Sequence, residues 1–387
     1  MDNYNQETKV VATVHKTCDE LLGKFWEIEE MPQINKLTVQ EKECEHLFNG
    51  NFKRHLDGKF QVKLPFKLET NLLGNSSLIA KRRYFALERK LDRNTELKVQ
   101  YHEFLKQYLK MGHMELINKE TVMKSGYYLP HHCVLRPESS STKLRVVFDA
   151  SCKTTTNVSL NDMLHTGPTL QEDLFKILLR FRKHRYVFSA DIEKMYRQIW
   201  VAEKHRKYQL IFWRWKPNES IKTYALKTVT YVTASAPYLA VKCLQKISDW
   251  IINQFPEESA VIRGDFYMDD LMTGGDCLES VKSLRKNVNN IMLEFGMPLR
   301  KWCSNEKSVL EGIDEQDIEI NLHIEAEKSN SVKTLGVIWN PKLDELGLRC
   351  KWEPQGKITK RSILSEVSRL FDPLGLVGPV IVNTKIL

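Results

Sequence analysis

The stretch GDFYMDDLMTGGD, residues 264–276, places two adjacent aspartates, Asp269 and Asp270, between short apolar runs. The simplest interpretation is a hairpin tip, because aspartate accepts turn conformations and hydrogen-bonds to its own backbone. The alternative is a site for a divalent cation, whose charge would offset the repulsion between the two carboxylates. A further carboxylate elsewhere in the chain is needed to decide between these interpretations.

That further carboxylate is Asp191, in SADIEKMY, residues 189–196. The preceding run YVFSA, residues 186–190, is rich in strand-forming residues, so Asp191 is expected at the end of a strand. Beside a hairpin with Asp269 and Asp270 at its tip, this strand can bring three carboxylates to one point. Hard oxygen ligands suit Mg²⁺, with Mn²⁺ as the alternative ion. Two such ions about 3.5–4 Å apart would activate a 3′-hydroxyl and stabilise leaving pyrophosphate, which is the chemistry of nucleotidyl transfer.

The bulk composition is compatible with this chemistry. The chain has 387 residues, 42% hydrophobic and 28% charged, which is ordinary for a soluble globular protein. Its length is sufficient for two or three subdomains with sizeable cores. Lys and Arg number 58 against 49 Asp and Glu, so the net charge of +9 permits a polyanionic partner without requiring one.

Several protein classes are disfavoured by the sequence. The 8 cysteines are scattered, and no C-x-x-C pair indicates a zinc knuckle or a redox dithiol. Scattered cysteines and a polar N-terminus without a secretory signal predict an intracellular, cytoplasmic protein. The apolar run at 374–382 is interrupted by Gly375, Gly378 and Pro379 and is too short to span a bilayer, so no membrane partner is expected.

Hydrophobic periodicity changes along the chain near residue 125. Residues 1–125 are expected to be mostly helical and charged, with a helical stretch from 84 to 111. From Tyr127 onward strands and helices mix without strict βαβ alternation, which favours an α+β fold with a largely antiparallel sheet. The expected strands are 143–149, 186–191, 208–213, the hairpin at 264–276 and 333–339; the expected helices are 174–181, 237–255 with Trp250 facing inward, 278–295 and 363–371.

Two short motifs resemble those of a known family. ADIEKMY, residues 190–196, and FYMDDLM, residues 266–272, look like motifs A and C of reverse transcriptases. Longer phrases in the same order resemble the Bel/Pao class of LTR retrotransposon polyproteins, and the likeness covers roughly residues 20 to 387. These phrases are YYLPHHCVLRPESSSTKLRVVFDAS at 127–151, SLNDMLHTGPTLQEDLFKILLRFRKH at 159–184, TASAPYLAVKCL at 233–244, LRKWCSN at 299–305 and TKRSILSEVSRLFDPLGLVGP at 359–379.

The resemblance implies a right-hand polymerase of the α+β class with an antiparallel palm sheet. A helical N-terminal extension and linker would occupy residues 1–125. Interleaved reverse transcriptase fingers and palm would occupy 126–345, and the start of a thumb or connection 346–387. No Asp-Thr-Gly or Asp-Ser-Gly protease signature is found, so we expect one slice of a Pol polyprotein or a truncated genomic copy.

The resemblance also carries roles onto matching residues. Asp191 and Asp269 would be the main metal ligands, and Asp270 would complete the acidic cluster. Tyr196 falls at the position of the steric gate, whose ring would exclude a ribose 2′-hydroxyl and favour dNTPs. Simple core packing is the alternative role for Tyr196.

Further roles follow from the same comparison. Arg145 matches an arginine that holds the triphosphate, since its planar donor fork suits phosphate, although a plain surface arginine is the alternative. Lys301 falls near the motif D lysine proposed to protonate pyrophosphate, with Arg300 adjacent. Leu335 to Val337 looks like motif E, the grip on the primer strand.

The chain departs from the family pattern at two positions. The family usually has glycine within TVTYGTASAP, and here Val232 stands at that place, after Tyr231, which still offers a ring for stacking. Glycine lets the backbone approach a ligand or adopt positive φ, which valine resists, so we expect weakened or absent polymerisation. Leu210 stands where the family often has arginine, which removes a possible phosphate contact.

Three functions remain in competition. The first is an RNA-directed DNA polymerase domain that takes an RNA or DNA template with primer, dNTPs and Mg²⁺. The second is a catalytically impaired retroelement relic that binds nucleic acid through a basic groove without polymerising. The third is a structural scaffold whose aspartates are only turn residues. A virus-like particle is the expected location if the chain is expressed within a full element, and no feature sets an oligomeric state.

Overall fold

The computed structural model describes most of the chain after residue 36. The described residues are 37–117, 126–135, 144–319, 332–334, 337–348, 359–368, 370 and 372–386. The part of the chain from Val39 onward forms one compact unit. Residues 1–36 and 118–125 of the expected N-terminal extension, positions 335–336 of the expected motif E and Phe371 of the expected last helix lie outside the described residues.

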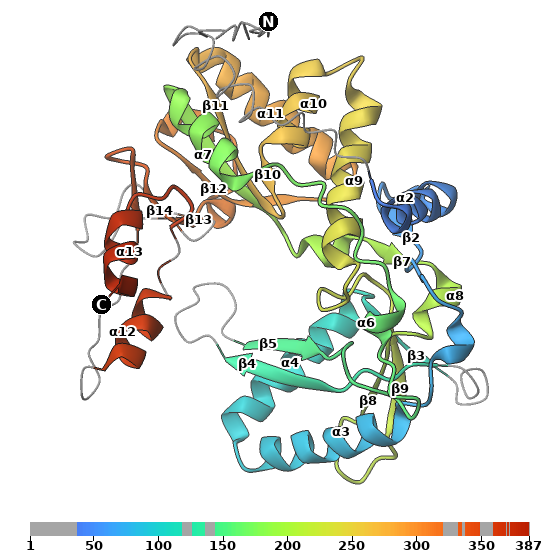
Figure 1. The fold of residues 1–387 in the computed structure, drawn as a ribbon. Coiled ribbons are helices and arrows are strands. Elements are labelled where there is room, and N and C mark those ends of the chain that lie inside the picture. The colour runs from blue at the N-terminus through green and yellow to red at the C-terminus, as the bar shows by residue number, and fades with distance from the viewer. Residues whose placement is uncertain are drawn as a thin grey trace, which may run out of the picture. The chain divides into compact units, whose positions relative to one another are not determined.

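A four-stranded antiparallel sheet carries the acidic residues of interest (Figure 1). Its strands are β6 (Tyr186–Ile192), β10 (Phe266–Tyr267), β11 (Asp270–Gly275) and β12 (Leu299–Ser304), in the order β10-β11-β6-β12. The interior strand β6 is buried over residues 187–190. A continuous apolar run is the pattern of a strand covered on both faces, which explains the composition of this segment.

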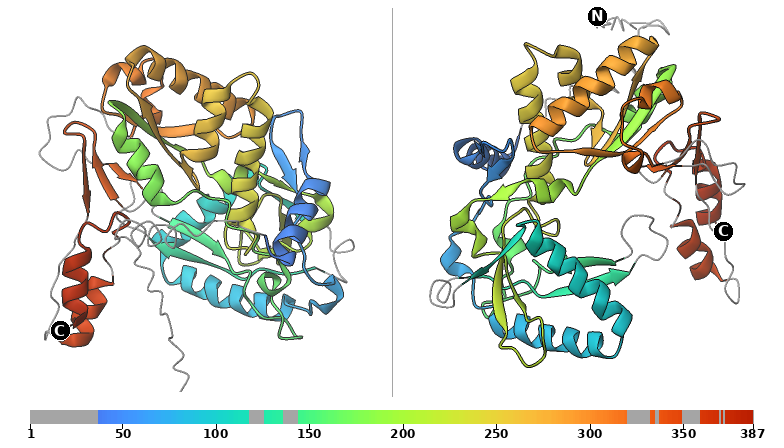
Figure 2. Two further views of the ribbon diagram at one scale, coloured as in Figure 1. Left: turned by 45° about the horizontal axis from the view of Figure 1, so that its top comes forward. Right: turned by 180° about the vertical axis from the view of Figure 1, so that it is seen from behind.

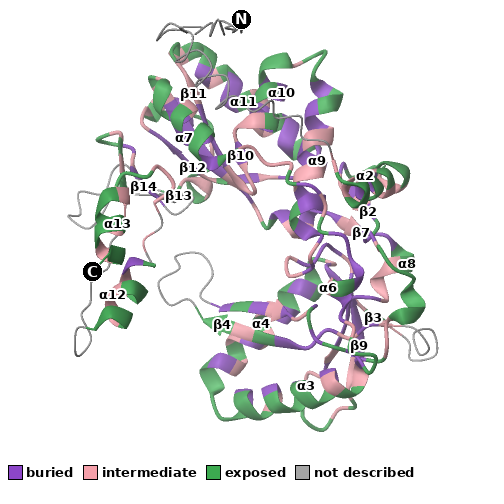
Figure 3. Ribbon diagram, viewed as in Figure 1, coloured by how far each residue is buried: buried purple, intermediate pink, exposed green. Residues whose placement is uncertain are grey.

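Helices cover both faces of this sheet (Figures 1 and 2). On one face α7 (Leu174–Lys183) buries Ile177 and Phe181 against Val187 and Met272. The other face joins the main core, where strand residues such as Phe188 pack with helical residues of α9 (Ala236–Ile251), α10 (Pro256–Gly264) and α11 (Leu278–Glu294). Buried residues accordingly concentrate on the strands and on the inner sides of these helices (Figure 3).

A second group of elements surrounds an aromatic core. It contains α3 (Ser77–Asp92), α4 (Thr95–Lys110), the sheet β3-β9-β8 and the hairpin β4-β5. The strand bounds are β3 (Met114–Ile117), β4 (His131–Leu135), β5 (Leu144–Phe148), β8 (Leu210–Trp213) and β9 (Lys222–Leu226). Tyr101 of α4 stacks on Trp213 with ring centroids 5.5 Å apart, which ties helix and sheet together.

The single helical stretch expected over 84–111 is wrong, because two helices occupy this region. Asn94 breaks the helix in an extended conformation, and its side chain accepts a hydrogen bond from the Leu97 backbone N–H at 2.9 Å. An asparagine in this conformation caps the next helix by satisfying one of its unpaired N–H groups. The local capping geometry therefore overrides the continuous periodicity of the apolar residues.

A third sheet pairs two strands near residues 53–62 with the strand that follows the motif at residues 190–196. It has the order β1-β2-β7, with β1 (Lys53–Arg54), β2 (Phe60–Val62) and β7 (Trp200–Val201). The preceding helix α2 (Val39–Asn51) docks on α9, where the Glu45 carboxylate accepts from Tyr238 at 2.9 Å and pairs with Lys242 at 2.5 Å. The remaining short elements are α6 (Leu160–Met163), α8 (Glu203–Arg206), η1 (Thr70–Leu72), η2 (Met195–Gln198), η3 (Lys307–Leu310) and η4 (Glu315–Asp317).

The last part of the chain forms a small antiparallel sheet and two helices. Its strands are β13 (Val332–Thr334), β14 (Val337–Asn340) and β15 (Glu345–Leu348), followed by α12 (Lys360–Val367) and α13 (Gly378–Ile386). The single strand expected over 333–339 is therefore wrong: β13 and β14 pair antiparallel, so the chain reverses between Thr334 and Val337. Trp339 of β14 packs edge-on against Phe181 of α7 at 5.0 Å, which attaches this sheet to the four-stranded sheet.

The expected class of mixed helices and strands with antiparallel sheets is confirmed. The strand expected at 186–191 and the helices expected near 174–181, 237–255 and 278–295 are present. Trp250 is an exception, since it is 47% exposed instead of facing inward. Its ring packs against the buried Phe60 and Phe295, with both centroid distances 5.8 Å, while the guanidinium of Arg54 lies 6.0 Å from its centroid, so Trp250 sits at the edge of the core. No helix in the described part of the chain is long and apolar enough to cross a lipid bilayer.

Candidate active site

The strand register brings the distant aspartates together. Asp191 at the end of β6 and Asp270 at the start of β11 are direct Cα partners in the antiparallel ladder. The hairpin tip consists of Met268 and Asp269, because Tyr267 already pairs with Asp270 and Met268 has a positive φ of 58°. The Asp269 carbonyl accepts from the Ile192 backbone N–H at 2.8 Å, which fixes the tip beside the end of β6. The Asp-Asp pair thus lies at a hairpin tip and beside the third carboxylate that the cation-site interpretation requires, while cation binding itself stays a prediction.

The three carboxylates influence one another electrostatically. Burial raises the pKa of Asp270 to about 7, and the charges of Asp269 and Asp191 add to this rise. Burial also raises the pKa of Asp269, with a further contribution from Asp191. Burial and mutual repulsion thus disfavour three negative charges at once in this site, and a nearby cation would offset that cost.

Lys301 of β12 supplies one such cation. Its Nζ donates to Oδ2 of Asp191 at 2.5 Å. Burial by itself would lower the pKa of Lys301, but the hydrogen bond to Asp191 and the charges of Asp191, Glu319 and Asp270 outweigh it and raise the pKa. The ammonium group therefore stays protonated at neutral pH.

The neighbouring Arg300 connects β12 to the loop that follows Asp191. Its Nε lies 3.0 Å from Oε2 of Glu193 and 3.4 Å from Oδ1 of Asp317. Glu193 also donates its backbone N–H to the Pro298 carbonyl at 2.9 Å. Sequence reasoning missed Glu193, Asp317 and Glu319, because their proximity follows from strand register and not from any motif.

Tyr196 and Arg145 lie on other elements and are coupled electrostatically to Asp269. Tyr196 lies on η2 and is half-buried, and burial together with the charge of Asp269 raises its pKa to about 12. Arg145 lies on β5 with its side chain exposed. Its charge acts on Asp269, where it opposes the rise in pKa that burial causes. Tyr196 also packs against the main hydrophobic core, which is the alternative role for it, so substrate binding by both residues stays a prediction.

Tyr231 and Val232 lie in the segment that precedes α9. The Tyr231 hydroxyl donates to the Val146 carbonyl of β5. Val232 is half-buried and is not among the non-glycine residues with positive φ. The part of the expectation that invoked a positive φ at this position is therefore not supported, whereas a close approach of ligand to this backbone stays a prediction.

Asn161 is a further residue that sequence reasoning missed. Its Nδ2 donates to the Val232 carbonyl at 3.1 Å, and its Oδ1 accepts from the Ala234 backbone N–H at 2.8 Å. These two bonds give the segment around Val232 the pairing that a strand partner would otherwise provide. The signal for Asn161 is its place in SLND, within one of the phrases that resemble Bel/Pao sequences.

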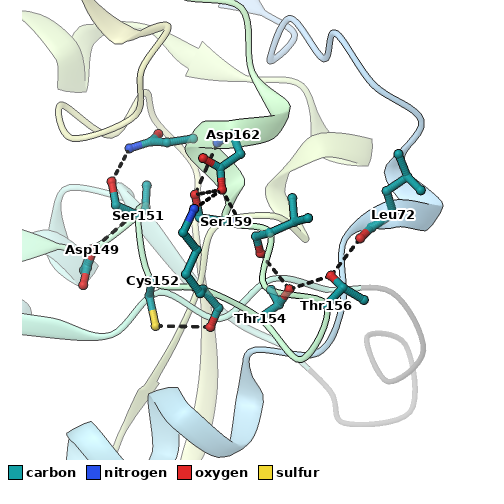
Figure 4. A network of polar contacts seen from close by, with 12 residues as sticks. Leu72, Asp149, Ser151, Cys152, Thr154, Thr156, Ser159 and Asp162 are labelled. Atoms are coloured by element: carbon teal, nitrogen blue, oxygen red, sulfur yellow. Dashed lines mark hydrogen bonds and ion pairs between the residues drawn. The ribbon is translucent and has the colours of Figure 1, made fainter.

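A polar network that includes Ser151, Ser159 and Asp162 surrounds the start of α6 (Figure 4). Ser159 and Asp162 form a capping box at the start of α6, and the Lys153 ammonium pairs with Asp162 at 2.5 Å. The hydrogen bond from Lys153 and those from Ser159 hold the pKa of Asp162 down at about 2. Asn161 also donates to Ser151 Oγ at 2.9 Å, so the loop after β5 and the segment before α9 share one anchor.

Leu210 does not face the acidic cluster. It is fully buried in β8, next to Gln209, whose amide donates to the carbonyls of Leu226 at 3.3 Å and Thr228 at 3.1 Å. The side chain at position 210 therefore belongs to the core of the β3-β9-β8 sheet. Leu335 and Gly336, two of the three residues expected to grip the primer, lie outside the described residues.

The residues fit a divalent cation by the chemistry of their donors. Asp191, Asp269 and Asp270 supply hard oxygen atoms, which Mg²⁺ and Mn²⁺ prefer. Within the part of the chain that the structure describes, no three His, Cys, Asp or Glu side chains are already grouped so that they could hold a metal ion. The Asp191 carboxylate instead contacts the Lys301 ammonium.

Comparison with known families agrees with this geometry. The model of the reverse transcriptase (RNA-dependent DNA polymerase) family matches residues 137–339, just over half of the 387-residue chain. A second model, the Pao retrotransposon-like RNaseH-like domain, matches residues 359–387. No curated protein matches the chain significantly. The first match contains β6, the β10-β11 hairpin and β12, with all of the acidic residues described above. The chain therefore belongs to the reverse transcriptase family, and the two matches together identify it as part of the Pol region of a Bel/Pao-class retrotransposon.

Proposed function

We propose that Asp191, Asp269 and Asp270 form the catalytic centre of an RNA-directed DNA polymerase that extends a primer by two-metal nucleotidyl transfer. The family acts on a nucleic-acid template with dNTPs and generally uses divalent metal ions. The single observation that carries the proposal is the register of the sheet, in which Asp191 pairs with Asp270 beside the Asp269 tip. This juxtaposition of carboxylates from two motifs is the minimum that two-metal chemistry requires.

Each carboxylate has a role in this proposal. Asp191 and Asp269 would bind two Mg²⁺ ions, or Mn²⁺, and Asp270 would complete the negative site. When bound, the ions would lower the pKa of the primer 3′-hydroxyl and stabilise charge on the leaving pyrophosphate. The mutual effect of the three carboxylates on their pKa values supports a shared cation site, because a bound cation removes the repulsion between them.

Residues around the cluster would select and orient the dNTP. The Tyr196 ring would lie under the sugar and clash with a 2′-hydroxyl. Arg145, exposed on β5 and electrostatically close to Asp269, would bind the triphosphate. Lys301 would donate a proton to pyrophosphate, and its raised pKa supports the presence of that proton at neutral pH.

The elements that carry these residues can be assigned to the parts of a right-hand polymerase. We assign the four-stranded sheet with α7, α9 and α11 to the palm, and the hairpin β4-β5, against which α3 and α4 pack, to the fingers. Residues 126–345 would then hold the interleaved fingers and palm, and 1–125 the extension and linker. Residues 346–387 were expected to begin a thumb or connection, and their segment 359–387 matches the RNaseH-like model.

A second candidate function follows from Val232. In this candidate the chain is an impaired relic, whose valine crowds the template or the dNTP although its φ causes no strain. The chain would then bind nucleic acid through its positive surface and fail to extend a primer. Tyr231 and Asn161 fix the backbone at this position, so it has little freedom to move away from a ligand.

Primer extension on poly(rA)/oligo(dT) with dTTP and Mg²⁺, combined with filter binding across a salt series, separates these functions. Polymerisation predicts extension that disappears in Asp269→Asn while filter binding persists. Salt-sensitive binding without extension would favour the relic. A protein that shows neither nucleic-acid binding nor primer extension would overturn both candidate functions.

A further inference from the structure

The contact between Lys301 and Asp191 occupies the carboxylate that the proposed function needs for metal. The Lys301 Nζ lies 2.5 Å from Asp191 Oδ2, and the two side chains are 37% and 21% exposed. An ammonium group at this distance uses the same lone pairs that a divalent cation would coordinate. Both cannot bind that oxygen in the same way at once.

A β-bulge is the feature that makes this contact possible. Arg300 is the direct Cα partner of Asp191, and the next paired residue of β12 is Cys303, opposite Ser189. In a regular strand the side chain after Arg300 would point to the opposite face of the sheet. Here Lys301 has a positive φ of 53°, and the extra residue of the bulge lets it reach Asp191. A positive φ is uncommon for lysine, so the local backbone is adapted to this placement.

The flanking residues hold the bulge on both sides. Arg300 is fixed by Glu193 and Asp317 at 3.0 and 3.4 Å, which ties the start of β12 to the loop after Asp191. On the other side Trp302 is 1% exposed and packs near Phe188 with ring centroids 6.0 Å apart. With its neighbours anchored, Lys301 has its backbone fixed and only its flexible side chain free to move.

We propose that Lys301 is the internal counter-ion of the acidic centre and competes with a divalent cation for Asp191. The inference rests on the proposed metal-binding role of Asp191. Without metal, the ammonium compensates the charge of the three carboxylates and keeps Asp191 in place. When metal binds, Lys301 releases Asp191 and becomes available for the leaving pyrophosphate. Glu319, whose charge already acts on Lys301, offers the released side chain a second acidic neighbour.

If Lys301 competes with a divalent cation for Asp191, removing its charge should change the metal affinity of the protein. A lysine that acts only in catalysis would leave that affinity unchanged. If the paired form makes up about nine-tenths of the metal-free protein, the apparent metal Kd is raised by about tenfold. Lys301→Met should therefore tighten Mn²⁺ binding by about tenfold. Lys301→Arg, which retains a cation near Asp191, should leave the Kd within about twofold of the wild type.

The test is Mn²⁺ binding to the full chain without substrates, measured by electron paramagnetic resonance. Two controls remove a positive charge without touching Asp191: Lys307→Met on η3, which is exposed, and Arg145→Met, whose charge acts on Asp269. The inference expects Lys301→Met to tighten binding several times more than either control. An effect equal to that of Arg145→Met, no effect, or weaker binding would overturn it.

Two further measurements keep the outcomes distinct. Asp191→Asn should abolish the tight Mn²⁺ site; if it does, and Lys301→Met still changes nothing, only the counter-ion inference fails. If Asp191→Asn has no effect on Mn²⁺, the proposed metal site itself fails. Thermal unfolding covers the case in which Lys301→Met folds poorly: the variant should lose stability without metal and regain more from Mn²⁺ than the wild type does. An equal Mn²⁺ response in both proteins would count against the inference.

Discussion

Asn161 connects the loop after β5 to the segment before α9 by donating to the Val232 carbonyl and accepting from the Ala234 backbone N–H, at 3.1 and 2.8 Å. The Asn161 side chain therefore sets the position of a backbone that the proposed function places against template and dNTP. A side chain that holds a substrate-facing segment from behind affects catalysis without touching substrate.

Asn161→Ala should lower kcat/KM for dNTP by about tenfold, which corresponds to about 1.4 kcal/mol. The two backbone groups would lose their partner, so the free energy of unfolding should also fall by about 1–2 kcal/mol. Steady-state single-nucleotide incorporation and urea unfolding measure both effects. Asn71→Ala is the matched control, since Asn71 is exposed and bonds only to Glu69 among the described contacts. A kcat/KM equal to that of the control would remove Asn161 from this role.

Val232→Gly should raise the rate of primer extension if the valine side chain crowds the ligand. Relief of backbone strain is not the reason, because Val232 has no positive φ. Glycine should cost about 0.5–1 kcal/mol of stability through its greater freedom in the unfolded chain. An unchanged extension rate, together with this loss of stability, would show that Val232 does not limit polymerisation.

Tyr196→Val should weaken discrimination against ribonucleotides. The proposed gate acts by ring bulk near Asp269, so the ratio of kcat/KM for dTTP over UTP should fall by at least ~10-fold. Tyr196→Phe keeps the ring and should keep the ratio. If both variants retain the wild-type ratio, Tyr196 serves the core instead of the sugar site.

Buried histidines should make the fold less stable as the pH falls. Burial lowers the pKa of His113, His131 and His205 to about 4. His131 illustrates the reason: its Nε2 lies 3.0 Å from the Phe212 carbonyl and must donate, so Nδ1 of the neutral ring accepts from the Tyr101 hydroxyl, and a second proton would place a charge in a buried site and break that hydrogen bond as formed.

The direction of this pH dependence follows from the lowered pKa values of the buried histidines. In the unfolded chain a histidine titrates near pH 6.5, so between about pH 6.5 and 4 the unfolded state binds more protons than the folded state. The free energy of unfolding therefore decreases as the pH is lowered through this range. Each of the three should cost roughly 1–1.5 kcal/mol between pH 7.5 and 5.5. Urea unfolding at both pH values should show a smaller loss for His131→Gln than for the wild type. His46→Gln, at an exposed position, should leave the loss unchanged. An identical loss in His131→Gln would contradict the assignment.

Much of the fold was predictable because strong local patterns decide it. The apolar run before Asp191 predicts β6, and three- and four-residue periodicity predicts α7 and α11. The break at Asn94 was not predictable from periodicity, since the apolar spacing continues through it. The exposure of Trp250 was not predictable, because a large ring at the edge of a core can contact buried rings such as Phe60 and a surface arginine such as Arg54 at once.

The candidate site was predictable only in part. Asp191, Asp269 and Asp270 stand out because adjacent carboxylates in apolar surroundings need a cation, and their spacing resembles a known family. The pairing of Lys301 with Asp191 depends on a bulge in β12, and that of Arg300 with Glu193 depends on strand register. Neither the position of a bulge nor the register of two strands can be predicted from the local sequence, so these contacts can be identified only in the folded sheet.

The most direct test of the account is single-nucleotide incorporation as a function of Mg²⁺ concentration for Asp191→Asn, Asp269→Asn and the control Asp276→Asn, which changes an exposed aspartate beyond the end of β11. We predict that each of the first two variants loses at least ~10³-fold in kcat while template–primer binding is retained, because either carboxylate is needed to hold the ions. The control should remain within about twofold of the wild type. Wild-type incorporation by Asp191→Asn or by Asp269→Asn would contradict the claim that Asp191 of β6 and Asp269 at the tip of the β10-β11 hairpin belong to one catalytic centre.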